Sequence, residues 1–249
     1  MHSTLVRSSC VAAGVLLFAL GLSAPTPAPA ASAARAAVPA GPQAAANPFE
    51  SEILAFEEAD RKQMPPAGGV VFVGSSSFKT WNLEDNFPNR GYINRGFGGS
   101  TMADAAYYVD RIAIKYKPRT IVLYEGDNDV NAGVSGEAIV ASLDKFVRTV
   151  HAKLPQTKIV FISIKPSIAR WSLVDRMRAA NDMIKAYVDR NDNMAYVDAD
   201  YVFMGWNHKP RPELYDPQGL LHPSAEGKKI WASLMEPFLQ DSGAKTAAN

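Results

Sequence analysis

The stretch Gly69-Val70-Val71-Phe72-Val73-Gly74-Ser75-Ser76-Ser77 decides the fold class of this chain. Its apolar part is short, uninterrupted and rich in β-branched residues, which predicts a strand buried on both faces, as in a parallel sheet. The glycine after it permits a tight turn at the carboxyl end of the strand, where open α/β sheets bind their ligands. A serine in that turn would face solvent, so the stretch predicts a candidate nucleophile at the sheet edge.

Further apolar runs follow along the chain and alternate with amphipathic segments. We expect strands near 92–94, 119–124, 158–164 and 194–198, and helices over about 49–58, 100–115, 136–154, 173–190 and 224–239. Ser100 is the expected cap of the second of these helices. Strands that alternate with helices in this way predict one α/β domain, a flavodoxin-like three-layer α/β/α sandwich with a parallel sheet of about five strands.

The amino end predicts export. Residues 1–24 resemble a signal peptide, because Arg7 precedes an apolar segment over 11–22 that is too short to span a bilayer comfortably. An uncleaved anchor is the alternative. Residues 25–48 form an Ala/Pro-rich linker, and residues 49–249 the folded domain. We therefore expect a secreted or periplasmic protein with no integral membrane span after signal removal.

Composition excludes several classes of function. The single cysteine, Cys10, lies in the predicted signal peptide, so a mature chain would have no disulfide, cysteine nucleophile or cysteine metal site. The formal net charge is +1, without the basic surplus typical of nucleic-acid binders, so no nucleic-acid partner is expected. His151 near a helix end and His208 in a loop are interpreted as structural, and no metal site is predicted.

Polar residues fall where the predicted sheet would place its ligand. Ser76 follows the first strand, Gly99 the second and Asn128 the third, and His222 lies just before the last helix. Each has a structural interpretation taken alone, as a helix cap, a loop glycine, a turn residue or a surface histidine. A dinucleotide loop around Gly99 is disfavoured because Thr101 stands where its third glycine is needed. Four such residues at one sheet edge favour a catalytic site.

These residues carry a resemblance to a known family. The blocks Gly74-Ser75-Ser76, Gly99, Gly126-Asp127-Asn128-Asp129 and His222-Pro223 resemble the four blocks of the SGNH hydrolases, also called the GDSL esterase/lipase family. The resemblance spans about residues 69–240. It implies that Ser76 is the nucleophile and His222 its general base. It also implies an oxyanion hole formed by Ser76, Gly99 and Asn128, with no cofactor.

The resemblance is incomplete in three blocks, and in the third of the four Asp127 replaces a more usual small polar residue. The family usually has Asp-x-x-His, whereas Gly219 lies three residues before His222 and the nearest carboxylate is Asp216. We predict Asp216 as the third catalytic residue, which would orient the imidazole. A Ser–His dyad, or a carboxylate from Asp198 or Asp200, is the alternative. In the first block, a serine at position 75 replaces a frequent aspartate.

The predicted function is that of a secreted serine esterase that hydrolyses carboxylic esters. The expected loops at the strand ends are mostly short, which favours small acyl groups on a small-molecule or glycan ester. Arg170 and Trp171, after the fourth strand, are predicted to bind substrate. An acyltransferase that uses the same site and a non-catalytic binding module that retains the fold are the alternatives.

Overall fold

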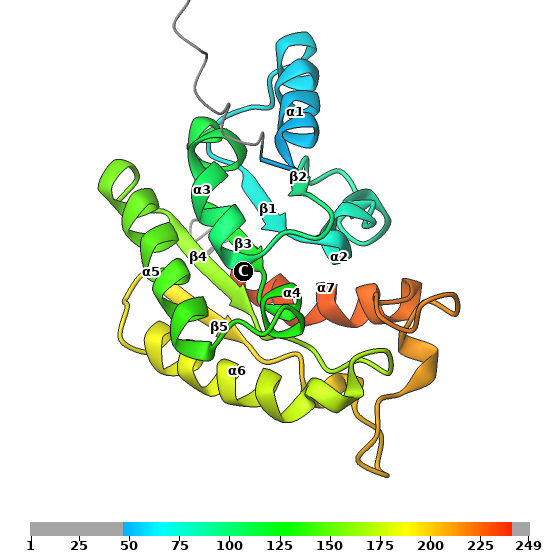
Figure 1. Cartoon of the computed structure of the whole chain (residues 1–249). Helices are drawn as coiled ribbons and strands as arrows, with labels where there is room; N and C mark the ends of the chain where they lie inside the picture. Colours follow the sequence, from blue (N-terminus) through cyan, green and yellow to red (C-terminus); the bar gives the residue numbers. More distant parts are fainter. Residues whose placement is uncertain (1–46, 241–249) are drawn as a thin grey trace, which may run out of the picture. The chain divides into compact units, whose positions relative to one another are not determined.

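The computed structural model describes residues 47–240, so the predicted signal peptide and nearly all of the predicted linker lie outside the described residues. The five strands of this part are β1 (Val70–Gly74), β2 (Ile93–Gly96), β3 (Thr120–Tyr124), β4 (Lys158–Ile162) and β5 (Met194–Val197). They form a single parallel sheet in the order β2-β1-β3-β4-β5 (Figure 1). The predicted parallel sheet of five strands is confirmed.

Helices connect successive strands, as the apolar periodicity predicts. Their bounds are α1 (Glu50–Lys62), α2 (Ser76–Lys79), α3 (Met102–Ile112), α4 (Asp127–Asn131), α5 (Gly136–Lys153), α6 (Val174–Val188) and α7 (Ala225–Leu239). Short 3-10 turns occur at 83–85, 114–116, 171–173, 201–203 and 212–214. No helix of the described part is long and apolar enough to cross a membrane.

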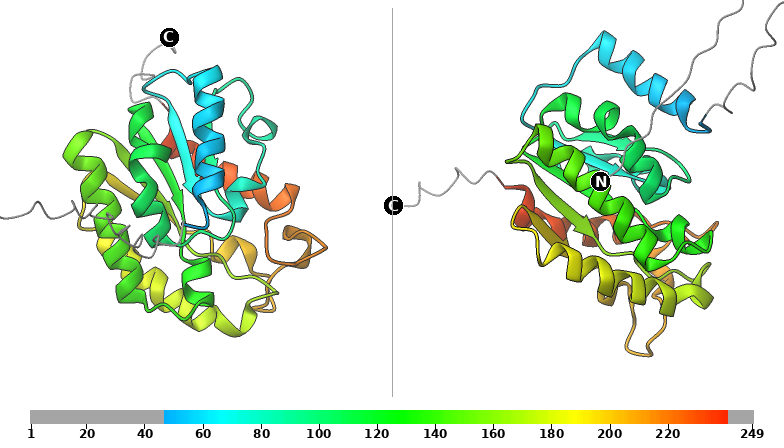
Figure 2. Two further views of the ribbon diagram at one scale, coloured as in Figure 1. Left: turned by 45° about the horizontal axis from the view of Figure 1, so that its top comes forward. Right: turned by 60° about the vertical axis from the view of Figure 1, so that its left-hand side comes forward.

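The sheet separates two hydrophobic cores, because neighbouring strand residues point to opposite faces. Val71 and Val73 pack with residues of α1, α3, α5 and α6, whereas Val70 and Phe72 pack with residues of α2 and α7. The views in Figures 1 and 2 show these helix layers on the two sides of the strands. All four side chains are fully buried, which contributes about 1.5–3 kcal/mol each.

The start of α3 differs from the prediction. Thr101, not Ser100, is the cap: its hydroxyl accepts from the Asp104 backbone N–H, while the Asp104 carboxylate accepts from the Thr101 backbone N–H. This reciprocal pair satisfies two N–H groups that the first helical turn leaves open. Ser100 does not cap the helix. Its hydroxyl instead donates a hydrogen bond to the carboxyl oxygen Oε1 of Glu125, at 2.6 Å.

The strand order determines where a ligand would bind. β1 lies between β2 and β3. The chain therefore passes from β1 to β2 on one side of it, and then crosses back to add β3, β4 and β5 on the other side. Crevices at such switch points, outside the carboxyl ends of the strands, are the usual ligand sites of open α/β sheets. Gly74, the last residue of β1, pairs with Gly96 and Tyr124, so the loops after these three strands begin at the same level.

Candidate active site

Ser76 differs from the serines on either side of it. Ser75 and Ser77 are only 2% and 3% exposed, whereas Ser76, the first residue of α2, is partly exposed. The close approach of α2 to β2 sets this position: a Cβ on Gly96 would lie 2.4 Å from the Lys79 backbone nitrogen. The strand, the glycine contact and the short helix together hold the Ser76 hydroxyl at the switch point.

His222 is held by a loop that closes on itself. Tyr215 and Pro223 form an antiparallel bridge, and the Asp216 backbone N–H donates to the His222 carbonyl at 2.9 Å. Inside the loop, the carboxylate of Asp216 accepts from the backbone N–H groups of residues 218, 219 and 222, at 3.1, 2.8 and 3.2 Å. The histidine therefore lies just before α7, in a turn that these hydrogen bonds hold in place.

The structure brings Ser76, His222 and Asp216 together. His222 Nε2 lies 2.9 Å from Ser76 Oγ, although the two residues are 146 positions apart. At this distance the hydroxyl can donate to a neutral imidazole that carries its proton on Nδ1. That nitrogen faces Asp216, whose Oδ2 lies 3.5 Å away. This is the order of groups expected of a serine nucleophile, its base and an orienting carboxylate.

The alternative carboxylates lie in other contacts. Asp200 is paired with Arg178, 3.0 Å from its guanidinium nitrogen. Asp198 is exposed and accepts the Asp200 backbone N–H at 3.0 Å. Among the three carboxylates considered from the sequence, Asp216 is the one that contacts the imidazole of His222 within the described residues.

Three donors are available for an oxyanion beside Ser76. As the first residue of α2, Ser76 has a backbone N–H without an intrahelical partner. Gly99 has a φ of +87°, which disfavours a side chain, and it is exposed, so its backbone N–H is accessible. Asn128, in α4, donates one N–H of its amide to the Ser100 carbonyl at 2.9 Å, which leaves the second N–H available.

A buried lysine contacts the buried carboxylate that precedes Asn128 in the chain, and the sequence alone predicts no function for either side chain. Lys165, after β4, is fully buried, and its Nζ lies 3.5 Å from Asp127 Oδ2. Asp127 also binds the guanidinium of Arg170, at 2.6 Å. Burial, and then the charge of Lys165, lower the pKa of His222 from its ordinary value, against the opposing effect of Asp216. The imidazole is therefore poised as a neutral base at neutral pH.

Glu125 forms a second buried support. It is fully buried, its Oε1 accepts from the Ser100 hydroxyl, and its Oε2 has no hydrogen-bond partner among the described residues. Burial raises the pKa of Glu125 well above its ordinary value, so this side chain is a neutral carboxylic acid over a wide pH range. It anchors Ser100, the residue that follows Gly99. In the sequence, the acidic residues within 125–129 indicate that carboxyl groups gather after the third strand, but they do not indicate which side chains these groups contact.

The residues predicted to bind substrate have different surroundings. Trp171 is partly exposed, and Lys209 Nζ lies 5.0 Å from the centre of its ring. The guanidinium of Arg170 instead contacts Asp127 and Asn128, so Arg170 borders the oxyanion donors. Substrate contact by either residue stays a prediction.

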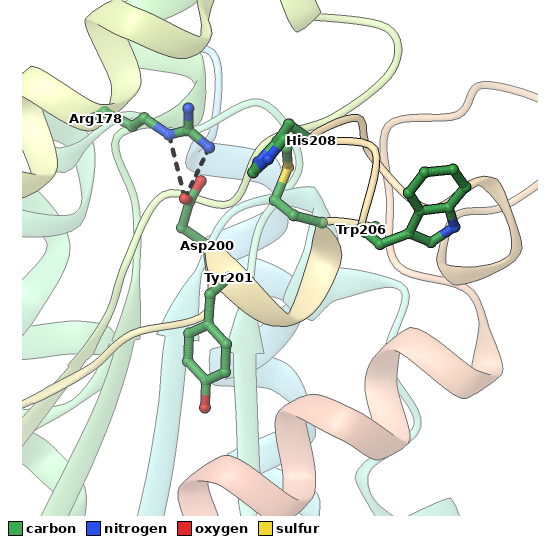
Figure 3. A pocket seen from close by; sticks show the side chains of 7 residues that line it. Arg178, Asp200, Tyr201, Trp206 and His208 are labelled. Atoms are coloured by element: carbon green, nitrogen blue, oxygen red, sulfur yellow. Dashed lines mark hydrogen bonds and ion pairs between the residues drawn. The ribbon is translucent and has the colours of Figure 1, made fainter.

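A surface groove of about 420 Å³ lies away from the predicted catalytic residues. Its lining comprises Arg178, Asp200, Tyr201, Met204, Gly205, Trp206 and His208. Figure 3 shows the Arg178–Asp200 ion pair at one end and the indole of Trp206, which is 95% exposed, at the other. Within residues 47–240 there is no group of three or more His, Cys, Asp or Glu side chains that could hold a metal.

Comparisons with known proteins bear on the family and the fold of this chain. The family described as GDSL-like Lipase/Acylhydrolase matches residues 69–230. The platelet-activating factor acetylhydrolase IB subunit alpha2 of Gallus gallus is 24% identical over 143 residues, a match that covers 54% of this chain and 61% of that protein. The chain thus spans less than two thirds of the length of this curated relative.

Solved structures share the fold at low sequence identity. A GDSL-like lipase from Bacteroides thetaiotaomicron has a TM-score of 0.67 and 21% identity, over 76% of this chain and 97% of that one. A variant of an acetyl-xylooligosaccharide esterase from Geobacillus stearmophilus has a TM-score of 0.57 and 16% identity, over 74% and 99%. The match of the family over residues 69–230 and the parallel sheet support one conclusion: the chain belongs to the GDSL-like lipase/acylhydrolase family.

Proposed function

We propose that this protein is a serine esterase that hydrolyses carboxylic esters with small acyl groups, carried on a sugar or another small molecule. The observation that carries the proposal is the 2.9 Å contact between Ser76 Oγ and His222 Nε2. Gly99 and Asn128 follow β2 and β3, the two strands that adjoin β1. Membership of an acylhydrolase family supports ester chemistry. The similarity of fold to an acetyl-xylooligosaccharide esterase supports small acyl groups on glycans.

The proposed reaction has two steps. His222 Nε2 takes the Ser76 proton while Oγ attacks the ester carbonyl, and the resulting oxyanion accepts hydrogen bonds from the three donors described above. The imidazolium then returns its proton to the leaving alcohol, which breaks the ester bond and leaves an acyl group on Ser76. A water molecule attacks the acyl-enzyme, gives its proton to His222 and releases the carboxylic acid, and the proton returns to Ser76.

The electrostatic environment supports the first step. A general base must be neutral before it accepts a proton, and burial together with Lys165 lowers the pKa of His222. Asp216, 3.5 Å from Nδ1, stabilises the imidazolium once it forms. The pKa of Asp216 itself is held low because backbone hydrogen bonds from Gly219, His222 and Gln218 outweigh the effect of its burial, so it is charged at neutral pH.

The test is a panel of p-nitrophenyl esters from C2 to C16, with acetylated xylooligosaccharides as the glycan arm and Ser76→Ala as control. We expect the highest kcat/KM at C2 to C4 and no turnover by Ser76→Ala. A preference for C8 or longer would refute the small-acyl part. An organophosphate that modifies the wild type but not Ser76→Ala would exclude a binding module. Higher yields of transfer than of hydrolysis with added alcohols would indicate an acyltransferase.

We also propose that the protein acts after export, on the basis of the signal-like residues 1–24. Mass spectrometry of the amino end of the protein recovered from culture medium or periplasm tests this proposal. A chain found intact in the cytoplasm, with residues 1–24 still present, would contradict it.

A further inference from the structure

The amide of Asn128 is fixed at both of its ends. Its Nδ2 donates to the Ser100 carbonyl at 2.9 Å, and its Oδ1 accepts from both terminal nitrogens of Arg170, each at 3.1 Å. A flipped amide would place its oxygen against the Ser100 carbonyl and its NH₂ group against the guanidinium. Two acceptors would then face each other at one end and two donors at the other. The arrangement with Nδ2 toward the site is therefore the one that the surroundings allow.

Arg170 is itself held in place. One of its terminal nitrogens donates to Asp127 Oδ1 at 2.6 Å, and its backbone N–H donates to the Ser167 hydroxyl at 3.2 Å. Its side chain is only 16% exposed, so little of the guanidinium faces solvent. Asp127, 7% exposed, is also in contact with Lys165, at 3.5 Å. Arg170 and Lys165 thus contact the same buried carboxylate, and the Arg170 guanidinium lies against the amide of Asn128.

We propose that Arg170 is a positioning residue that keeps the Asn128 amide turned with its NH₂ group toward the oxyanion. The inference rests on the proposed function, in which Asn128 is an oxyanion donor. The guanidinium acts in two ways through the same contact. It fixes the orientation of the amide, and its charge polarises the carbonyl of the amide, which makes the N–H at the opposite end a stronger donor.

Removal of Arg170 would weaken the hold on the amide. Asn128 Oδ1 would lose the two guanidinium nitrogens that donate to it at 3.1 Å, and the Ser100 carbonyl alone would orient the amide. The second N–H would then be less firmly aimed and less polarised. Because the amide would still donate to the oxyanion part of the time, the loss of rate has Asn128→Ala as its upper bound.

The competing interpretation is direct contact between Arg170 and the substrate. The two roles predict different results when Arg170 and Asn128 are changed together. A positioning residue acts only while Asn128 is present, so its effect disappears in the Asn128→Ala background. A substrate contact acts independently, so the two fold-changes multiply.

The experiment is a double-mutant cycle with Arg170→Ala, Asn128→Ala and the double variant, assayed on uncharged p-nitrophenyl acetate. Arg178→Ala, which breaks the remote ion pair with Asp200, is the matched control. We expect Arg170→Ala to lower kcat by about 10- to 100-fold with KM changed less than threefold, which is less than the roughly 10²- to 10³-fold loss expected when an oxyanion donor is removed entirely. The double variant should have the same kcat as Asn128→Ala. Methylguanidinium at millimolar concentration should raise the kcat of Arg170→Ala toward that of the wild type, and it should have no such effect on the double variant.

The outcomes separate the two proposals. If Asn128→Ala leaves kcat unchanged, the oxyanion assignment in the proposed function fails. If Asn128→Ala slows turnover and the Arg170→Ala effect multiplies with it, or raises KM instead of lowering kcat, the positioning role is overturned while the esterase proposal stands. Thermal unfolding checks that each variant is folded. Should Arg170→Ala fail to fold, Arg170→Lys replaces it in the cycle, because an amine can pair with Asp127 but lacks the fork that reaches Asn128 as well.

Discussion

Replacement of Asp216 by Asn tests the electrostatic part of the site most directly. The change removes one negative charge 3.5 Å from His222 Nδ1 and keeps the size of the side chain. The amide oxygen of Asn can still accept from the backbone N–H of Gly219, as Asp216 does at 2.8 Å. The His222 backbone N–H loses its acceptor at Oδ2, but the backbone bridge between Tyr215 and Pro223 and the Asp216 N–H bond to the His222 carbonyl remain. The loop that carries His222 should therefore survive, and the chief loss is the stabilisation of the imidazolium that forms during each proton transfer.

The size of the loss follows from the distance and the exposure. Coulomb's law at 3.5 Å gives about 1.2 kcal/mol in bulk water and about 4.7 kcal/mol at an effective dielectric constant of 20. The side chains of His222 and Asp216 are 30% and 32% exposed, so solvent screens the pair and the lower half of this range applies. About 1.5–3 kcal/mol corresponds to a loss of kcat of roughly 10- to 150-fold.

The assay is kcat and kcat/KM on p-nitrophenyl acetate across pH, for wild type, Asp216→Asn and His222→Ala. Asp216 raises the pKa of His222, so its neutralisation should lower that pKa further. Because the base must be neutral, the acid limb of kcat/KM should move to lower pH in Asp216→Asn. At its optimum pH the variant should thus have a lower kcat/KM than the wild type. At acidic pH, however, it should keep a larger fraction of its optimum kcat/KM than the wild type does.

Two results would refute the reasoning. A loss of less than threefold, with the acid limb unmoved, would mean that His222 works as a dyad with Ser76. A loss equal to that of His222→Ala in a folded variant would mean that the carboxylate does more than supply charge. Asp198→Asn is the control, because that exposed carboxylate accepts from the Asp200 backbone N–H and, within residues 47–240, makes no hydrogen bond or ion pair with His222.

Four further predictions follow from the same contacts. Asn128→Ala should lower kcat by about 10²- to 10³-fold at unchanged unfolding temperature, as measured by steady-state kinetics and calorimetry. The charge of Lys165 is the second cause, next to burial, of the lowered pKa of His222. Lys165→Met removes this charge, so the pKa of His222 should rise and the acid limb of kcat/KM should move to higher pH. Glu125 has a raised pKa when folded, so its contribution to stability is complete below about pH 4.5 and is lost as pH rises through the folded pKa. Glu125→Gln should flatten this fall in unfolding free energy, and an unchanged slope would contradict the assignment. Gly96→Ala, whose Cβ would lie 2.4 Å from a backbone nitrogen of α2, should destabilise the fold by about 1–3 kcal/mol in urea unfolding.

Much of the fold could be predicted from local patterns. The run Val70–Val73 predicts a doubly buried strand, and in the structure all four residues are fully buried in an inner strand of the sheet. The residue that caps α3 is not the one that the sequence predicts. Thr101 and Asp104 form a capping box in the structure, but Ser100 is an equally good cap by residue type. Ser100 is drawn away by Glu125, a partner 25 residues distant that local sequence does not indicate.

The sequence by itself determined the alternation of strands and helices, the family, and the positions of Ser76, Gly99, Asn128 and His222 at the ends of elements. These features depend on the period of apolar residues and on short motifs, which are local properties of the chain. Only the tertiary structure decided that Asp216 faces His222, and that Arg170 lies on Asn128 instead of in solvent. The first contact depends on closure of a loop, which turns Asp216 back toward a histidine six residues later. The second depends on strand register, which brings together residues 42 positions apart. Local sequence patterns encode neither.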